Sequence, residues 1–215
     1  MVSAEKEIVE ASAAETKIVK DEADGALQQA LPILEKAKSI VDALDKNSIV
    51  ELKALNNPPP AVEMVMSCVM TMLGEKDVKW DVIKSVHIKE PAAFIKRVQQ
   101  FRVEDMSEKL LKMIRTKWFA LPEYNFENVS KKSVPAGALC QWSKALSSYY
   151  DVHKQIVPMK EKAAEMDRKL NESLAVLKKK MDELNIVKAN VAALVANANR
   201  LEAEKNELEF RMKRD

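Results

Sequence analysis

Residues 152–184 read VHKQIVPMKEKAAEMDRKLNESLAVLKKKMDEL, and the same pattern continues to the end of the chain. Steps of four and three residues from Val152 to Met212 reach eighteen positions, and fifteen of them are apolar. A repeat of 3.5 residues keeps one apolar stripe of a helix facing a partner. The stripe predicts a long coiled-coil helix over residues 152–215, with lysine and glutamate on its solvated surface.

A second apolar stripe overlaps the first in this predicted helix. It replaces Ser173 and Lys180 of the first stripe with apolar residues and consists of Leu170, Leu174, Leu177, Met181 and Leu184. Two stripes would allow pairing with a partner in two registers, and hence a sliding motion along the helix. From these residues alone, a static discontinuity in the repeat is the simpler alternative.

Residues 1–57 contain no aromatic residue and predict another long helix. Its stripe passes through Ala30, Leu34, Ala37, Val41 and Leu44. Proline inside a helix removes a backbone donor and costs roughly 3 kcal/mol. We therefore expect a kink or local irregularity near Pro32.

The two predicted helices each need a partner for their apolar stripe. Residues 4–55 and 152–215 would span about 78 and 96 Å, at about 1.5 Å per residue. The segment between them returns the chain, so an intramolecular antiparallel hairpin is the economical solution. A parallel homodimer through each helix is the alternative.

Residues 58–151 contain nearly all the aromatic residues and six of the eight prolines. Short helices are predicted from Ala61 to Gly74, around Trp80–Val86, from Pro91, from Val103 to Phe119, and from Pro135 onward into the coiled coil. No alternating strand pattern occurs. We expect a small core around Trp80, Trp118, Trp142 and several methionines. The predicted fold is all-α, a long antiparallel coiled-coil hairpin capped by a small helical bundle, with domains 1–57, 58–151 and 152–215.

The sequence lacks the residue patterns of nucleotide-binding, metal-binding and catalytic sites. The three glycines are scattered, whereas loops that hold nucleotide phosphates need clustered glycines. The cysteines and histidines have no metal-ligand spacing, so Cys68 and Cys140 are interpreted as buried small hydrophobes. No signature places a nucleophile beside a base. We expect no enzyme activity, no cofactor and no metal within this chain.

The charge and the hydropathy indicate the kind of partner. No run approaches the 18 or so apolar residues that span a bilayer, and four glutamates in the first twenty residues argue against a signal peptide. A soluble, intracellular protein without a membrane partner is expected. Between Lys84 and Lys132, eleven basic residues outnumber six acidic ones, and Lys96–Arg97 and Lys131–Lys132 are adjacent basic pairs. This excess favours an acidic partner surface. Nucleic acid would suit the charge too, but the aromatic residues have core spacing and are not interleaved with the basic ones, so none is expected.

An ordered set of residues resembles the stalk of dynein heavy chains. The resemblance covers essentially the whole chain. The residues that carry it are Lys53 to Val62 with its proline run, Leu73–Gly74, Trp80, Pro122 to Phe126, Ser133 to Gly137, Leu139 to Trp142, Tyr149 and Val157–Pro158. The most diagnostic parts are Asn57–Pro58–Pro59 and the pair of Trp142 with Pro158. The triple proline and the segment Gly137 to Trp142 look more like axonemal dyneins than the cytoplasmic one.

The resemblance implies a function for the chain. In dyneins this hairpin projects from a ring of ATPase modules and carries a microtubule-binding domain at its tip, and sliding of one stalk helix against the other switches the affinity. The expected partners are tubulin in microtubules and the rest of the heavy chain. The expected location is the cytoplasm and cytoskeleton, with a ciliary or flagellar axoneme favoured. A structural coiled-coil scaffold whose basic tip binds another protein or nucleic acid is the alternative.

Site residues follow from the same resemblance. The implied microtubule-binding residues are Glu63, Lys96, Arg97, Glu127, Lys131 and Lys132, and the implied junction and register residues are Pro58, Pro59, Pro158, Leu170, Leu174, Leu177, Met181 and Leu184. Glu63 stands where the family often has lysine. A carboxylate there should repel an acidic lattice and leave binding more dependent on Lys131 and Lys132.

Overall fold

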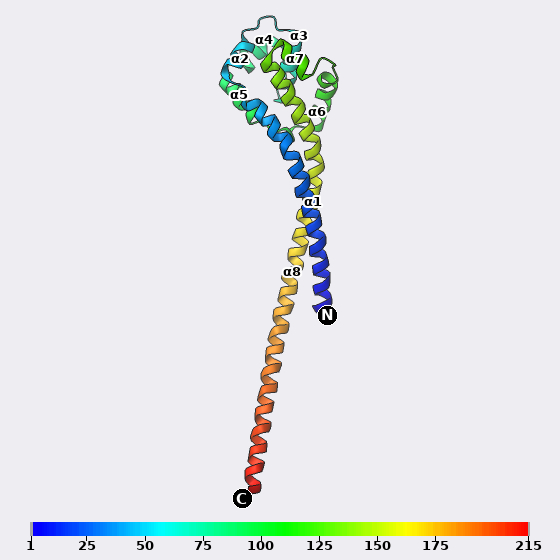
Figure 1. Cartoon of the computed structure of the whole chain (residues 1–215), viewed down its shortest axis with the longest axis vertical. Helices are drawn as coiled ribbons and strands as arrows, with labels where there is room; N and C mark the ends of the chain where they lie inside the picture. The colour runs from blue at the N-terminus through cyan, green and yellow to red at the C-terminus, as the bar shows by residue number, and fades with distance from the viewer. Residues whose placement is uncertain (1, 215) are drawn as a thin grey trace. The chain divides into compact units, whose positions relative to one another are not determined.

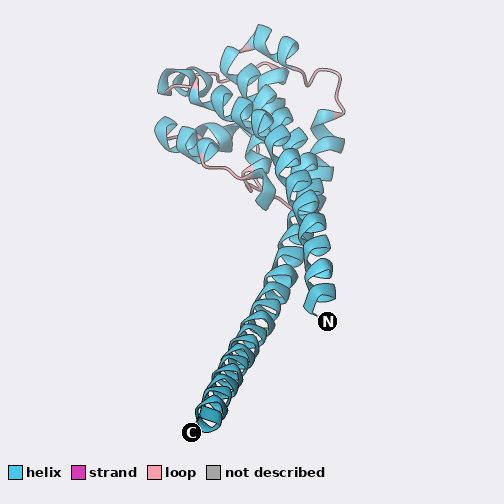
Figure 2. Ribbon diagram, turned by 60° about the horizontal axis from the view of Figure 1, so that its bottom comes forward, coloured by secondary structure: helices cyan, strands magenta, loops and turns pink. Residues whose placement is uncertain are grey.

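A computed structural model describes residues 2–214, and those residues form helices and loops without a strand (Figures 1 and 2). Two long helices, α1 (Val2–Asp42) and α8 (Val134–Arg214), begin and end the described chain. The chain divides into unit 1, residues 1–21 with 161–215, and unit 2, residues 22–160. The all-α class is confirmed, whereas the domain limits at 57/58 and 151/152 stay predictions from composition.

Unit 1 is an antiparallel helix pair. Glu5 of α1 pairs with Lys180 of α8 at 2.8 Å, and Lys20 pairs with Asp167 at 3.3 Å, so the residue order along the two helices is opposite. Val9 is buried against Leu170 and Leu177 between these ion pairs. The two segments of one chain therefore partner each other, as the intramolecular hairpin predicts and the parallel homodimer does not.

Burial along both long helices follows a seven-residue spacing. In α1 the buried positions of this series are Val9, Thr16, Ala23, Ala30, Ala37 and, just beyond the helix, Leu44. In α8 the series is Tyr149, Ile156, Ala163, Leu170 and Leu177. This spacing is that of a heptad repeat, which confirms the coiled-coil interpretation of both segments.

The apolar stripe of α8 is covered over only part of its length. Beyond Leu177 the stripe is exposed at Val187, Val191, Leu194, Leu201, Leu208 and Met212. Glu5, near the beginning of α1, pairs with Lys180, so α1 contacts α8 only about as far as this residue. Within the described residues, the stripe is therefore covered as far as Leu177.

The first predicted helix is two helices. α1 ends at Asp42, and α2 (Lys46–Lys53) begins after a turn. The Asp45 carboxylate caps α2, because it accepts hydrogen bonds from the Ser48 backbone N–H at 2.8 Å and the Ser48 hydroxyl at 2.9 Å. A single helix over residues 4–55 was thus wrong at residues 43–45.

Pro32 does not interrupt α1. The helix is continuous through Gly25 and Pro32. The carbonyl left without a donor belongs to Gln28, four residues earlier, and both residues are exposed. Water can bind that carbonyl, so the proline is tolerated without a break in the helix.

Unit 2 surrounds a central helix, α3 (Pro60–Met72), whose side chains are mostly buried. It is packed by α4 (Trp80–Val82) with the π-helical turn η1 (Ile83–His87), by α6 (Glu108–Ile114) with the π-helical turn η3 (Arg115–Phe119), and by α7 (Phe126–Lys132). Helix α5 (Pro91–Gln99) packs on α2. The predicted core is confirmed, since Trp80, Trp118 and Trp142 are all buried.

One predicted helix of this unit begins later than expected. Residues 103–105 form a separate 3-10 turn, η2 (Val103–Asp105), and α6 starts only at Glu108. The Ser107 hydroxyl accepts a hydrogen bond from the Leu110 N–H at 3.1 Å and so caps α6. Met113, expected in the core, is 40% exposed.

Both cysteines are free and buried, as the sequence predicts. Burial raises the pKa of the Cys68 thiol to about 12 and that of Cys140 to about 11. The nearby Tyr124 hydroxyl lies 2.6 Å from the Ser143 hydroxyl, which donates to the Cys140 carbonyl at 2.7 Å. Ser143 has one proton to donate, so Tyr124 is the donor in the first bond. Burial holds the pKa of Tyr124 well above its usual range.

Candidate functional site

The proline run sets the start of α3. Pro59 is the N-cap residue with extended backbone angles, and Pro60 is the first helical residue, where the missing N–H costs nothing. The segment before the prolines is anchored to the next helices. The Trp80 indole donates to the Leu55 carbonyl at 2.9 Å, and Lys84 donates to the Asn56 side chain at 2.8 Å.

Helix α7 lies against the start of α3. Beside this contact is a hollow of about 430 Å³. It is lined by Pro59, Pro60, Ala61, Met64, Glu123, Asn128 and Lys132. Lys131 and Lys132 are exposed in the last turn of α7. The structure thus brings the second basic pair beside the proline run and the first turns of α3.

Sequence reasoning missed α7 itself. The residues alone predict no helix between Pro122 and Pro135, and the resemblance places Glu127, Lys131 and Lys132 at the start of the last tip helix, although Asn125 carries a signal for a separate helix. Its side chain accepts a hydrogen bond from the Asn128 N–H at 2.8 Å, which is the N-cap role that asparagine favours. The preference of asparagine for the N-cap position, applied to Asn125, predicts a helix that begins at Phe126 and contains Lys131 and Lys132.

A glycine places α7 close to α8. A Cβ atom built on Gly137 of α8 would lie 2.9 Å from Ser130 Cα in α7. The Ser130 hydroxyl is buried there and has no hydrogen-bond partner. Only a residue without a side chain fits at this crossing, so Gly137 fixes how closely the lysine-bearing helix approaches α8.

Arg97 lies at the opposite end of α3. Its guanidinium donates to the Leu73 carbonyl at 2.9 Å and pairs with Glu75 at 2.9 Å, so it holds the C-terminal end of α3 against α5. Gly74 ends α3 there with a φ of +95°, a conformation that favours glycine. The thirteen residues of α3, Pro60–Met72, extend about 20 Å. The structure therefore does not bring Lys96 and Arg97 together with Lys131 and Lys132.

The two acidic residues of the predicted site occupy equivalent places. Glu63 lies in the first turn of α3 and Glu127 in the first turn of α7, and both are exposed. A carboxylate in a first turn stabilises the positive end of the helix dipole. This gives Glu63 a structural reason to stand where the resembling family often has lysine.

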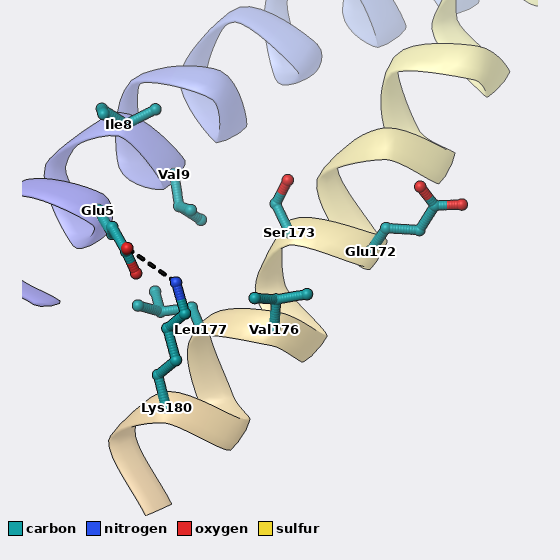
Figure 3. A pocket seen from close by; sticks show the side chains of 8 residues that line it. All are labelled: Glu5, Ile8, Val9, Glu172, Ser173, Val176, Leu177 and Lys180. Carbon is teal, nitrogen blue, oxygen red and sulfur yellow. Dashed lines mark hydrogen bonds and ion pairs between the residues drawn. The ribbon is translucent and has the colours of Figure 1, made fainter. Parts of the chain in front are cut away.

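The register residues divide into two groups in unit 1. Leu170 and Leu177, shared by both apolar stripes, are buried, whereas Leu174 is 43% exposed and Met181 36%. Ser173 instead lies on the side of α8 that faces α1, in a groove of about 400 Å³ with Glu5, Ile8, Val9 and Lys180 (Figure 3). The pair therefore uses the first stripe near Ser173 and Lys180, and Leu174 and Met181 of the second stripe remain on the surface. Leu184, which both stripes share, is exposed too.

Pro158 lies inside α8 without interrupting it. The carbonyl that lacks a donor belongs to Lys154, and both residues are exposed. As at Pro32, solvent can bind the free carbonyl. Residues Val134 to Arg214 therefore form one helix, as predicted for the passage into the coiled coil.

Residues 2–214 contain no cluster of three or more histidine, cysteine, aspartate or glutamate side chains placed to hold a metal ion. None of the helices within that range combines the length and the apolar character that a bilayer crossing requires.

A family model described as the microtubule-binding stalk of dynein motor matches residues 1–211. The chain belongs to this family. The matched region is the stalk and not the ATPase site of a dynein, which fits a segment without catalytic residues. Membership also fits the antiparallel helix pair and the helical bundle described above.

Dynein heavy chains of both cytoplasmic and axonemal kinds are similar to this dynein stalk. It is 31% identical to a cytoplasmic dynein heavy chain of Paramecium tetraurelia over 83% of its length, and 26% identical to dynein axonemal heavy chain 3 of Homo sapiens over 97%. It is 33% identical over 62% of its length to the dynein-1-beta heavy chain of the flagellar inner arm I1 complex of Chlamydomonas reinhardtii. The chain spans only 3–5% of the length of these relatives.

Proposed function

We propose that this dynein stalk binds microtubules through a surface centred on Lys131 and Lys132 of α7 and on the start of α3. The observation that carries the proposal is the match to the microtubule-binding stalk family together with the placement of Lys132 at the hollow beside Pro59 and Pro60. Exposed lysines beside a concave surface suit an acidic protein lattice. Glu63 and Glu127 belong to the same surface, whereas Lys96 and Arg97, at the other end of α3, are proposed as a separate second contact.

The residues of the proposed surface contribute unequally. Lys96, Lys131 and Lys132 are exposed, and within residues 2–214 none of them makes an ion pair. Arg97 already binds Glu75 and the Leu73 carbonyl, so we assign it mainly a positioning role for α3. Glu63 and Glu127 stabilise helix starts and reduce the net positive charge of the surface.

The microtubule affinity is switched by a shift between α1 and α8. α8 offers two apolar stripes that share Leu170, Leu177 and Leu184, and the shift would exchange Ser173 and Lys180 for Leu174 and Met181. Since α1 and α8 are each continuous between units 1 and 2, displacement of either helix along its axis would be transmitted to the bundle. ATP hydrolysis by the rest of the heavy chain would drive it.

The proposed location is the cytoskeleton of a cilium or flagellum. The residues that favour it are Pro58 to Pro60 and the segment Gly137 to Trp142, which resemble axonemal dyneins. Similarity to the flagellar inner-arm heavy chain agrees with it. Cytoskeletal association itself is common to the cytoplasmic and axonemal relatives.

Co-sedimentation with microtubules tests the proposal. The chain should pellet with microtubules at low ionic strength and less as salt screens the lysines. Lys131→Glu with Lys132→Glu should weaken binding about tenfold or more, which is about 1.4 kcal/mol. The matched control is Lys178→Glu with Lys179→Glu, an adjacent exposed pair on α8, which should bind as the unmodified chain does.

Two results would contradict the proposal. One is equal affinity of the α7 double variant and its control with helicity unchanged. The other is displacement of the chain from microtubules by duplex DNA or RNA at equal ionic strength, which would favour a scaffold that binds nucleic acid.

A further inference from the structure

Unit 2 contains a cavity of about 210 Å³ at the meeting point of three segments. Leu34, Lys38 and Val41 come from α1, and Trp142 and Leu146 come from α8. The third segment is the end of α5 and the residues that follow it, namely Val98, Gln99, Gln100, Phe101, Arg102 and Glu104. None of its lining residues belongs to α3 or α7. The cavity is therefore separate from the proposed microtubule-binding surface.

The floor of the cavity is apolar and aromatic. Val41, Val98, Trp142 and Leu146 are each exposed by 3% or less. The Phe101 ring meets the Trp142 ring edge-on, with centroids 5.8 Å apart and planes inclined by 60°. An apolar floor with two aromatic rings is the common composition of small-molecule sites between helices, and it favours a flat ring as the occupant.

The rim of the cavity is polar, and its charges are unequally engaged. Arg102 pairs with Glu104 at 3.1 Å and with Asp105 at 3.6 Å. The Gln99 amide donates to Asp42 of α1 at 3.3 Å. Lys38 is exposed and makes no ion pair within residues 2–214. A ligand can therefore pair with Lys38 without breaking an existing ion pair. A ligand that does so must carry a negative charge.

We propose that this cavity binds a small planar aromatic carboxylate. The ring lies on the floor beside Phe101 and Trp142, and the carboxylate pairs with Lys38. A cavity of about 150 Å³ accepts benzene, so the larger one here suits a fused two-ring system such as indole. Because α1, the segment after α5 and α8 all touch the occupant, binding stabilises this arrangement of unit 2 by mass action.

Titration of the full chain, followed by two-dimensional NMR, tests the proposal. The probes are indole-3-acetate, neutral indole and cationic tryptamine, which share a ring system and differ in charge. We expect saturable shifts of the Trp142 indole N–H and not of those of Trp80 and Trp118. Affinity should decrease from indole-3-acetate to indole to tryptamine, and the melting temperature should rise with the first probe.

Variants separate the ring contact from the charge contact. Lys38→Gln should weaken indole-3-acetate binding about fivefold and leave indole unchanged, whereas the control Lys36→Gln, elsewhere on the exposed surface of α1, should change neither. Leu34→Trp, with helicity checked, should abolish binding of all three probes by filling the cavity. The proposal is overturned by absence of saturable Trp142 shifts, by equal affinity for the three probes, or by undiminished binding to Leu34→Trp.

Discussion

Gly137 permits the close crossing of α7 and α8, because a larger residue would collide with Ser130. Gly25 of α1 is a glycine without such a neighbour. A Cβ on Gly137 would collide with Ser130, backbone included, whereas a Cβ on Gly25 of α1 meets nothing within 4 Å. Both glycines lie inside helices, where glycine costs roughly 1 kcal/mol relative to alanine. Only Gly137 has a packing reason that offsets this cost.

Gly137→Ala should therefore destabilise the chain by about 1–3 kcal/mol, because α7 must move away from α8. Urea unfolding followed by circular dichroism measures the change. Gly25→Ala is the matched control and should be neutral or stabilising by up to about 1 kcal/mol. Equal effects of the two substitutions would show that the crossing at Ser130 does not constrain the fold.

The buried thiols predict a loss of stability at alkaline pH. In the folded chain burial raises the pKa of Cys68 to about 12, whereas a free thiol ionises near 9.0. Above about pH 9 the unfolded chain therefore binds fewer protons than the folded chain, so the free energy of unfolding falls as pH rises. The loss is up to about 1.4 kcal/mol per pH unit for such a group.

The comparison of the chain with a Cys68→Ala variant, by urea unfolding at about pH 8 and about pH 10.5, tests this decrease in stability. Lysines and the tyrosines other than Tyr124 contribute equally to both proteins, so the difference between them reports on Cys68. Cys68→Ala should flatten the decrease between the two pH values, whatever its effect at pH 8. An identical decrease in the variant would mean that the Cys68 thiol is not protected in the folded chain.

At the scale of helices, α7 depends on its cap. Asn125→Ala removes the acceptor of the Asn128 N–H and should cost about 1 kcal/mol of stability. It should also weaken microtubule binding, since Lys131 and Lys132 lie at the other end of a seven-residue helix. Asn125→Asp keeps the cap and should preserve stability in the same urea assay. Loss of stability in Asn125→Asp as large as in Asn125→Ala would contradict the capping role.

The elements that sequence reasoning predicted well are those defined by long repeats. The heptad stripe predicted α8 and the pairing of its first half, because a seven-residue period in burial needs no knowledge of distant contacts. The proline run and Gly74 gave both ends of α3 for local reasons. Local capping by Asp45 and Ser107 was overlooked, so the break before α2 and the late start of α6 were missed.

The candidate site was less predictable than the fold. The basic pair Lys131–Lys132 is visible in the sequence, but its placement beside Pro59 and Pro60 depends on how α7 packs on α3 and α8. Arg97 was interpreted as a surface charge, whereas the structure engages it with Leu73 and Glu75. The sequence shows which residues are charged. Whether such a side chain is available to a partner depends on its tertiary contacts.

Alanine substitutions in the part of α8 that α1 covers and in the part that it leaves exposed should have different effects on stability. Leu177→Ala removes a buried side chain from the helix pair and should cost about 2–3 kcal/mol, less than a fully enclosed site. Leu194→Ala, at a position 69% exposed on the same stripe, should be nearly neutral. Thermal unfolding of both variants, monitored by helicity, makes the comparison. Equal losses would mean that α1 does not cover Leu177 in solution.

At the scale of the molecule, α1 and α8 each continue from the helix pair of unit 1 into unit 2, which carries the proposed binding surface. The net charge of the chain is only +2, yet residues 61–150 carry fourteen basic and ten acidic side chains. The remainder is therefore slightly acidic. Under the proposed function, residues 61–150 are thus the part of the chain that an acidic lattice would attract.

The most direct test of this account is the microtubule affinity of the chain with α1 and α8 locked by disulfides. Val9→Cys with Leu177→Cys holds the pairing seen here, and Val9→Cys with Leu174→Cys or Met181→Cys holds shifted pairings. The account predicts salt-sensitive binding whose affinity differs about tenfold or more between locked registers and becomes equal after reduction. Equal affinity in every register, or no binding in any, would contradict it.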